Sequence, residues 1–269
     1  MAIKLFTMVK DEVDIIREWI IFHGELFGYD NIYIIDNYST DGTYKIIEEY
    51  KDKINIFRER SYLQKGILMK KLIDKFCHTN DIAFPIDIDE FIVYYDDNKV
   101  FVDKKTINDY INNLPEAYVY KANYILSLIT DNTKYGYDNA ILQCKYGVYD
   151  NYGESAKTFF KLKNYNGNID HGNHINTKNY HLSKICLVHY HLRNLNQIKK
   201  KIYNNVTGLG YPDDLNKLKD IIQNNNNCPG SHHVNSYIRI LENTFELQTY
   251  NYHPSNIELT PMSRFIFQL

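Results

Sequence analysis

Cysteine is scarce in the 269-residue sequence, and its four copies lie far apart with no CxxC pair. A zinc cluster needs such close pairs, and a small secreted domain needs a higher cysteine density for its disulfides, so both classes are excluded. No stretch reaches the roughly 18 apolar residues of a membrane span. The first ten residues also lack the small-residue cleavage site of a signal peptide. We therefore expect a cytoplasmic protein with reduced thiols and no membrane span.

An excess of charge of one sign is also absent. Thirty-one Lys and Arg residues face 33 Asp and Glu residues, which gives a formal net charge of −2 at pH 7. General nucleic-acid binding requires an excess of positive charge, which this balance does not provide, so no nucleic-acid partner is expected. Glycine and proline are few, at 12 and 6, whereas tyrosine is frequent, at 25. We interpret the tyrosine, together with the many asparagines, first as the codon bias of an AT-rich genome.

The first ninety residues alternate between apolar runs and segments with helical periodicity. The apolar runs are typical of buried strands and occupy four segments: 3–9, 31–36, 53–57 and 81–86. The periodic segments lie between them: 12–27, 39–50 and 62–78. This alternation predicts an α/β fold with a mostly parallel central sheet and helices on both of its faces.

Beyond Phe91 the pattern becomes mixed, which predicts a partly antiparallel second half. Strands are expected at 117–128, 140–148, 157–162 and 184–190. Helices are expected at 106–113, from 195 onward, at 215–223 and at 234–249. Segments rich in Asn and Gly are expected as loops at 163–180 and 224–231. No internal repeat or clear linker divides the chain, so we predict one domain.

A tight acidic group follows the fourth apolar run. Asp87, Asp89 and Glu90 come directly after it, and Phe91-Ile92-Val93 then continues the chain as an apolar stretch. Open α/β sheets bind ligands beyond the carboxyl ends of their strands. Carboxylates this close repel one another unless a cation lies between them, and a hard divalent cation held there suits a diphosphate. The alternative is a solvated acidic turn, because the DxD tripeptide is common.

Two other carboxylates are predicted at the same edge of the sheet. Asp36 ends the second apolar run, just before Asn37, and a carboxylate in that place can accept from a ribose hydroxyl or a base N–H. Glu12 lies just past the first run and would face the same crevice. A helix cap explains the residues from Ser39 to Asp41, but it does not explain Asp36.

Histidines and basic residues are the other candidates for binding. His189 and His191 alternate along an expected strand, so both would point to one face, as a metal-binding pair requires. The alternative is one hydrogen-bonded core histidine and one loop residue. His232 and His233 lie in an Asn-rich segment and are interpreted as surface residues.

A short basic run follows the histidine pair and is a candidate for binding an anion. It comprises Arg193 and the three lysines at 199–201. Three consecutive lysines on a helix cannot all point inward, so most of them are interpreted as a solvated face. Arg193 is the favoured contact for a diphosphate, and Lys65 is a second candidate.

The order of these motifs resembles that of GT-A-type glycosyltransferases, in particular the family 2-like enzymes and glycosyltransferase family 92. The resemblance covers residues 1–95 best and includes Gln64, before the third expected helix. Its motifs are a KxE turn, a Glu-Trp helix, a DNxSxDGT turn, a DxDEF element and a segment like HxxxRS: Lys10–Glu12, Glu18-Trp19, Asp36–Thr43, Asp87–Phe91 and His189–Asn194.

The resemblance implies a metal-dependent enzyme that moves a sugar from a nucleotide-sugar donor to a hydroxyl acceptor such as a glycan, with inversion. By the habit of the family the donor is expected to be a UDP-sugar. Mn²⁺ or Mg²⁺ would lie on Asp89 and Asp87, and His189 or His191 would supply a further ligand. The donor-binding residues would be Glu12, Asp36, Asn37, Gln64, Lys65, Asp87 and Arg193. Residues 1–95 would form the nucleotide-binding half, 96–210 the acceptor and catalytic half, and 211–269 a C-terminal helical extension.

The catalytic base must come from the second half, because the acceptor hydroxyl has to lose a proton. By analogy with inverting enzymes we expect an acid, Asp170 first and Glu154 second, with His171 as a further candidate. Asp170 and His171 begin a turn that resembles the family's GxHR-like element but lacks its arginine. Two other hypotheses fit the carboxylates: a non-catalytic nucleotide- or sugar-binding module, and a metal-dependent nucleotidyltransferase or phosphohydrolase.

Overall fold

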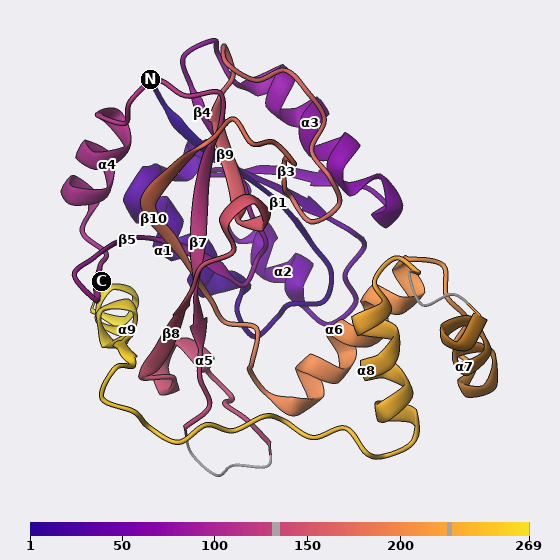
Figure 1. Cartoon of the computed structure of the whole chain (residues 1–269). Helices are drawn as coiled ribbons and strands as arrows, with labels where there is room; N and C mark the ends of the chain where they lie inside the picture. The colour runs from indigo at the N-terminus through magenta and orange to yellow at the C-terminus, as the bar shows by residue number, and fades with distance from the viewer. Residues whose placement is uncertain (131–134, 225–227, 269) are drawn as a thin grey trace.

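The computed structural model describes residues 1–130, 135–224 and 228–268. Figure 1 shows a twisted sheet with helices packed on both of its faces and a group of helices projecting from one end. The strands of the described residues are β1 (Ile3–Val9), β2 (Ile32–Asp36), β3 (Asn55–Arg58), β4 (Ile82–Pro85), β5 (Glu90–Asp96), β6 (Lys99–Phe101), β7 (Tyr120–Ser127), β8 (Tyr146–Asp150), β9 (Lys157–Lys161), β10 (His181–His189) and β11 (Ile257–Glu258).

The helices include nine α-helical segments within the described residues. They are α1 (Ile16–Phe27), α2 (Thr43–Glu48), α3 (Lys65–Phe76), α4 (Lys104–Asn112), α5 (Ala140–Gln143), α6 (Leu195–Gly208), α7 (Leu215–Asn224), α8 (Ser231–Leu241) and α9 (Thr260–Phe267). Three single turns of 3₁₀ helix connect other elements: η1 (Tyr29–Asn31), η2 (Tyr62–Gln64) and η3 (Gly153–Ser155).

The sheet is parallel in its first half and mixed in its second, as the sequence predicts. Its order is β3-β2-β1-β4-β9-β7-β10-β5-β6, and β8 pairs with both β7 and β11. Strands β1 to β4 pair in parallel, and so do β7 and β10, whereas β9, β5, β6, β8 and β11 pair antiparallel. The six parallel-running strands therefore end at one edge, and the α/β fold class is confirmed.

Alternation along the strands produces two apolar layers. Leu5 and Ile34 belong to a core that α1 and α9 cover, whereas Phe6 and Ile35 belong to a core that α3 covers. Neighbouring residues of a strand point to opposite faces, so a continuously apolar strand serves both layers. This is why the runs at 3–9 and 31–36 are apolar at nearly every position.

Two expectations for the second half are wrong in part. The segment 140–148 is a short helix, α5, followed by β8, because the Asn139 side chain accepts from the Leu142 N–H and caps a helical turn. The helix expected at 234–249 ends at Leu241, and Asn243 has a left-handed φ of 58° that closes it. Strands β5 and β6 were not predicted.

Residues 211–268 begin as helices and then return to the sheet. Helices α6, α7 and α8 share a separate apolar cluster, and Figure 1 shows them at one end of the molecule. The chain then runs back along the sheet, where β11 pairs with β8 and Met262 of α9 is fully buried. Of the loop expected at 224–231, residues 225–227 lie outside the described part of the chain.

Across the described ranges, no helix combines the length and the apolar character that crossing a bilayer requires.

Candidate functional site

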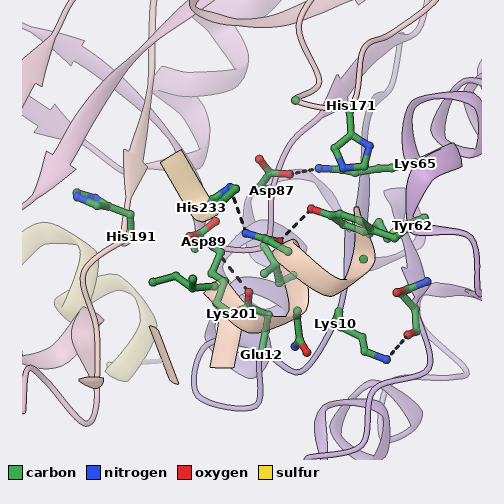
Figure 2. Close-up of a pocket in the computed structure, with 18 of the residues that line it drawn as sticks. Lys10, Glu12, Tyr62, Lys65, Asp87, Asp89, His171, His191, Lys201 and His233 are labelled. Atoms are coloured by element: carbon green, nitrogen blue, oxygen red, sulfur yellow. Dashed lines mark hydrogen bonds and ion pairs between the residues drawn. The ribbon is translucent and has the colours of Figure 1, made fainter. Parts of the chain in front are cut away.

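A cavity of about 520 Å³ lies at the carboxyl ends of β1, β2, β4 and β10. Its size is within the usual range for small-molecule sites. The sheet side contributes Glu12, Asn37, Asp87 and Asp89, and α6 and α8 form another wall. Figure 2 shows acidic, basic and imidazole side chains converging on this space. The strands that the sequence predicts as parallel therefore bring most of the predicted polar residues together.

Asp87 is fully engaged by basic and amide groups. Lys65 Nζ lies 2.5 Å and Asn173 Nδ2 3.0 Å from Asp87 Oδ1, while Lys157 Nζ lies 2.8 Å from Oδ2. Burial alone would raise the pKa of Asp87, but Lys157 and Lys65 outweigh it and lower the pKa below its ordinary value. Asp87 is therefore an ionised anchor for the two lysines, and each of its oxygens already has a partner.

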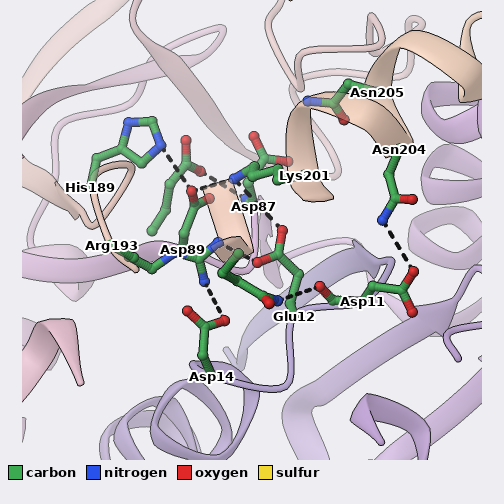
Figure 3. Close-up of polar contacts among 12 residues, drawn as sticks. Asp11, Glu12, Asp14, Asp87, Asp89, His189, Arg193, Lys201, Asn204 and Asn205 are labelled. Carbon is green, nitrogen blue, oxygen red and sulfur yellow. Dashed lines mark hydrogen bonds and ion pairs between the residues drawn. The ribbon is translucent and has the colours of Figure 1, made fainter. Parts of the chain in front are cut away.

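The two carboxylate oxygens of Asp89 differ, because one is paired and the other has no hydrogen-bond partner among the described residues. Its Oδ2 forms an ion pair with Lys201 and lies 3.3 Å from His189 Nε2, as Figure 3 shows. Its Oδ1 is buried without a hydrogen-bond partner in the described structure. Burial would raise the pKa of Asp89, but Lys201 and His189 outweigh it and lower the pKa. Asp89 is therefore an ionised carboxylate with one unsatisfied acceptor.

Glu12 belongs to a buried ionic cluster with Arg193. The Arg193 guanidinium, whose side chain is 1% exposed, forms ion pairs with Glu12 Oε2 and, at 3.0 Å, with Asp14 Oδ1. Burial raises the pKa of Asp14 to about 6, against the opposing effect of Arg193. Glu12 also lines the cavity, whereas Arg193 does not. Arg193 therefore joins the start of α1 to the start of α6, which differs from the predicted diphosphate contact.

Two further predicted donor-binding residues, besides Arg193, are absent from the cavity lining. Asp36 is fully buried, and its oxygens accept from Ser39 N and Arg58 Nε, each at 3.0 Å. Gln64 lies on the surface at the end of η2. Asn37 and Lys65 do line the cavity. The end of β2 therefore contributes Asn37, and Asp36 stabilises the turn behind it.

Among the three predicted base candidates, His171 lines the cavity and the two acids do not. Asp170 turns its carboxylate onto His174, accepting from its backbone N–H at 2.6 Å. Glu154 is exposed in η3. His171 packs edge-on against Tyr62, with ring centroids 4.5 Å apart, and its Nε2 is buried without a partner in the described structure. Burial and Lys65 lower the pKa of His171, which keeps it neutral at pH 7.

The predicted metal ligands fit a cation only in part. No group of three or more His, Cys, Asp or Glu side chains forms a metal cage within 1–130, 135–224 and 228–268. His191 lines the cavity but directs Nδ1 toward the His189 carbonyl at 3.3 Å, and burial lowers its pKa to about 4. Asp89 and His189 do fit, because two ligands of one cation lie about 3 Å apart. Such a partial site suits a cation that also binds phosphate oxygens.

Several lining or supporting residues escaped prediction. Lys201 is the lysine of the basic run that faces inward, next to the Ile198 and Ile202 stripe of α6, so helical phase could have identified it. Lys157 is buried between Asp87 and Glu90, at 2.8 and 2.9 Å. His233, interpreted from the sequence as a surface residue, lines the cavity instead, and burial lowers its pKa to about 4.

Comparisons with known proteins give distant structural likenesses. No family model and no curated protein matches the chain. The solved structure of TarS 1–349 from S. aureus is 12% identical, with a TM-score of 0.42, and the match covers 91% of this chain and 71% of that one. Its complex with UDP is 12% identical with a TM-score of 0.41, covering 90% and 71%. The bifunctional IspDF from Campylobacter jejuni is 11% identical with a TM-score of 0.31, covering 61% and 42%. These structures are what the chain is similar to, and no residue role follows from them.

Proposed function

We propose that this chain transfers a sugar from a nucleotide-sugar donor, a UDP-sugar, to a hydroxyl acceptor. The observation that carries the proposal is the unpartnered Oδ1 of Asp89, a residue that lines the cavity together with Lys65 and Lys201. A buried carboxylate acceptor beside cationic groups suits a ligand that brings both a cation and a diphosphate. The order of the KxE, DNxSxDGT and DxDEF motifs supports the same conclusion by resemblance.

The donor would be bound along the edge of the sheet. Lys65 and Lys201 offer ammonium groups to the diphosphate, and Asn37 and Glu12 offer polar groups to the nucleoside. Asp89 and His189 would hold Mn²⁺ or Mg²⁺, which offsets the charge that grows on the departing diphosphate. Asp87 acts indirectly, because its two oxygens orient Lys65 and Lys157.

His171 is the base that the geometry favours. The acceptor oxygen bonds to the anomeric carbon while the bond from that carbon to the diphosphate oxygen breaks, and the hydroxyl proton passes to His171 Nε2. A neutral imidazole with no competing partner at Nε2 is suited to that transfer. A single base on the acceptor side corresponds to direct displacement with inversion, which is the stereochemistry we propose.

Titration of UDP tests the donor site. With Mn²⁺ present, wild type should bind UDP and Asp89→Ala should lose the metal-dependent part of the affinity, as measured by isothermal titration calorimetry. Asp109→Ala removes the same charge from the exposed face of α4 and serves as the matched control. Equal metal-dependent affinity in wild type and Asp89→Ala contradicts the proposal. A thermal-shift panel of nucleotide sugars with Mn²⁺ then identifies the donor, because a bound ligand raises stability by mass action.

A non-catalytic binding module is the second candidate. The observation that favours it is the position of Asp170 and Glu154, neither of which lines the cavity to serve as an acidic base. A binding module would bind UDP but release no nucleoside diphosphate from a nucleotide sugar at any pH. Sugar transfer or donor hydrolysis measured above the background rate would show that the chain is an enzyme and not a binding module.

A further inference from the structure

We propose that Lys201 is a resident counter-ion of Asp89 that changes partners when the site is filled. Resting on the proposed function, this inference concerns how the two parts of the ligand assist each other. A divalent cation would replace Lys201 at Asp89, and the released ammonium group would bind the diphosphate. Cation and diphosphate would then bind cooperatively, with Lys201 as the coupling residue.

Lys201 is placed to make this exchange. Its Nζ forms the ion pair with Asp89 Oδ2 and lies 3.7 Å from Glu12 Oε1, so it stands between two carboxylates. Its side chain is 27% exposed, and it lines the cavity, whereas Asp89 is 1% exposed. The flexible four-carbon stem of lysine allows the ammonium group to change position while the backbone stays in place.

Helix α6 has other attachments that hold it while Lys201 moves. Gln197 Nε2 donates to the Asp11 carbonyl at 2.6 Å, and Asn204 Nδ2 donates to Asp11 Oδ2 at 3.1 Å. At the adjacent residue, Tyr62 donates its hydroxyl to Asn205 Oδ1 at 3.0 Å. The exchange therefore requires a new side-chain rotamer and no movement of the helix.

The lysine pair at Asp87 cannot exchange in the same way. Lys157 is 3% exposed and also bonds to Glu90 and the Gly172 carbonyl, each at 2.9 Å. Asn173 donates to the same carboxylate that Lys65 contacts. Removing Lys157 would take the ion pair from Glu90, which is 1% exposed, and leaving a buried carboxylate unpaired is strongly unfavourable. Lys65 is itself only 8% exposed. Asp89 differs in having an unpartnered Oδ1 and a partner, Lys201, that is 27% exposed, so it is where we place the cation.

The exchange predicts effects of opposite sign on two ligands. A cation at Asp89 competes with Lys201, so removing the lysine should strengthen binding of the cation alone. The diphosphate gains a contact from the released Lys201, so removing it should weaken binding of the diphosphate. Because coupling between two ligands is reciprocal, the factor by which Mn²⁺ strengthens UDP binding should also fall.

The test uses Lys201→Met and the neighbouring Lys199→Met in the full chain. Lys199 lies on the same helix and has no ion pair or hydrogen bond in the described structure, so it controls for the loss of one positive charge. Mn²⁺ binding alone is followed by electron paramagnetic resonance, and UDP binding with Mn²⁺ by calorimetry. Relative to Lys199→Met, we expect Lys201→Met to bind Mn²⁺ about tenfold more tightly and UDP about tenfold more weakly, the size of one charge-assisted hydrogen bond.

Unchanged or weaker Mn²⁺ binding in Lys201→Met overturns the exchange, because a cation that has to displace Lys201 from Asp89 must bind more tightly once the lysine is gone. Lys201→Arg keeps the charge and should restore most of the coupling, which separates exchange from misfolding. A wild type that binds Mn²⁺ but no UDP overturns the proposed function, while the Mn²⁺ measurement still decides whether Lys201 competes at Asp89.

Discussion

Asp36, Asp87 and Asp89 stand at or just beyond the ends of β2 and β4, on either side of β1, yet their partners give them different roles. Asp36 is saturated by Ser39 N and Arg58, and Asp87 by Lys65, Lys157 and Asn173. Asp89 alone of the three keeps an unpartnered oxygen within the described structure. Whether each carboxylate can accept a ligand therefore depends mostly on residues that are far away in the sequence.

At this scale, the base assignment makes a prediction about pH. Burial and Lys65 lower the pKa of His171, whereas Asp87 and Asp170 partly oppose them. The neutral imidazole is the active form, so the transfer rate should be constant above that lowered pKa and fall as the pH drops through it. In His171→Gln the rate should fall by about 10²- to 10⁴-fold, the usual contribution of a general base, and this acid limb should disappear.

UDP affinity is the control measurement, because we propose that His171 contacts the acceptor hydroxyl and not the nucleotide donor. UDP should bind His171→Gln within about threefold of wild type, since ordinary contact changes away from a ligand are small. His174→Gln, which alters the neighbouring imidazole paired with Asp170 at 3.5 Å, should retain the acid limb. A His171→Gln enzyme with an unchanged rate would remove His171 from the mechanism.

At the scale of the elements, the loop that carries His171 is fixed by close packing against α3. A Cβ on Gly66 would lie 2.2 Å from the Ile169 carbonyl oxygen, far inside contact distance. Lys157 and Asn173 hold the same loop from the other side, through the Gly172 carbonyl and Asp87. The absence of a side chain at Gly66 thus sets the distance between α3 and the loop.

Gly66→Ala should therefore push the loop away and displace His171. We expect a stability loss of about 1–3 kcal/mol, the usual cost of overpacking, and a larger fall in transfer rate than in UDP affinity. Urea unfolding and steady-state kinetics measure the two effects. Ile67→Ala, at a position that is 58% exposed on the same helix, is the control and should change neither.

Periodicity predicts the elements of the first half because each strand there is a compact apolar run. It misses β5 because Glu90–Val93 follows the acidic turn without a break, and it misreads α5 because a short apolar run fits either a helix or a strand. For the site, strand ends predict that Glu12, Asn37, Asp87 and Asp89 lie at one edge of the sheet, and all four line the cavity. The partners of these residues are distant in the sequence, such as Lys157 for Asp87. Local sequence patterns therefore cannot predict them.

At the scale of the whole molecule, the described chain has two kinds of core. The sheet cores contain Trp19, the one tryptophan of the sequence, which is fully buried. The helical unit of α6, α7 and α8 has its own cluster, in which Leu218 and Val234 are fully buried. The two kinds of core meet at the cavity, so local opening of the helical unit would disturb the site before the sheet unfolds.

The Leu218→Ala variant tests whether the helical unit and the sheet cores unfold separately. The cavity that it leaves should cost about 2–5 kcal/mol, and the loss should fall on the helical unit. We expect the far-ultraviolet circular dichroism to begin its urea transition earlier than Trp19 fluorescence, which reports the sheet. Met262→Ala, in the sheet core, should shift both signals together. Coincident transitions in Leu218→Ala would show that the two cores unfold as one.

The separate core of the helical unit has a consequence for how this protein can be re-engineered. One wall of the cavity, including Asn205 and His233, comes from helices that pack chiefly on one another, whereas the sheet edge supplies Glu12 and Asp89. Sequence change in that wall leaves the strands that carry the carboxylates untouched. Libraries confined to the cavity-facing positions of α6 and α8 other than Lys201, which pairs with Asp89, would therefore vary ligand preference at little expense in foldability, and they are where a search for altered specificity should begin.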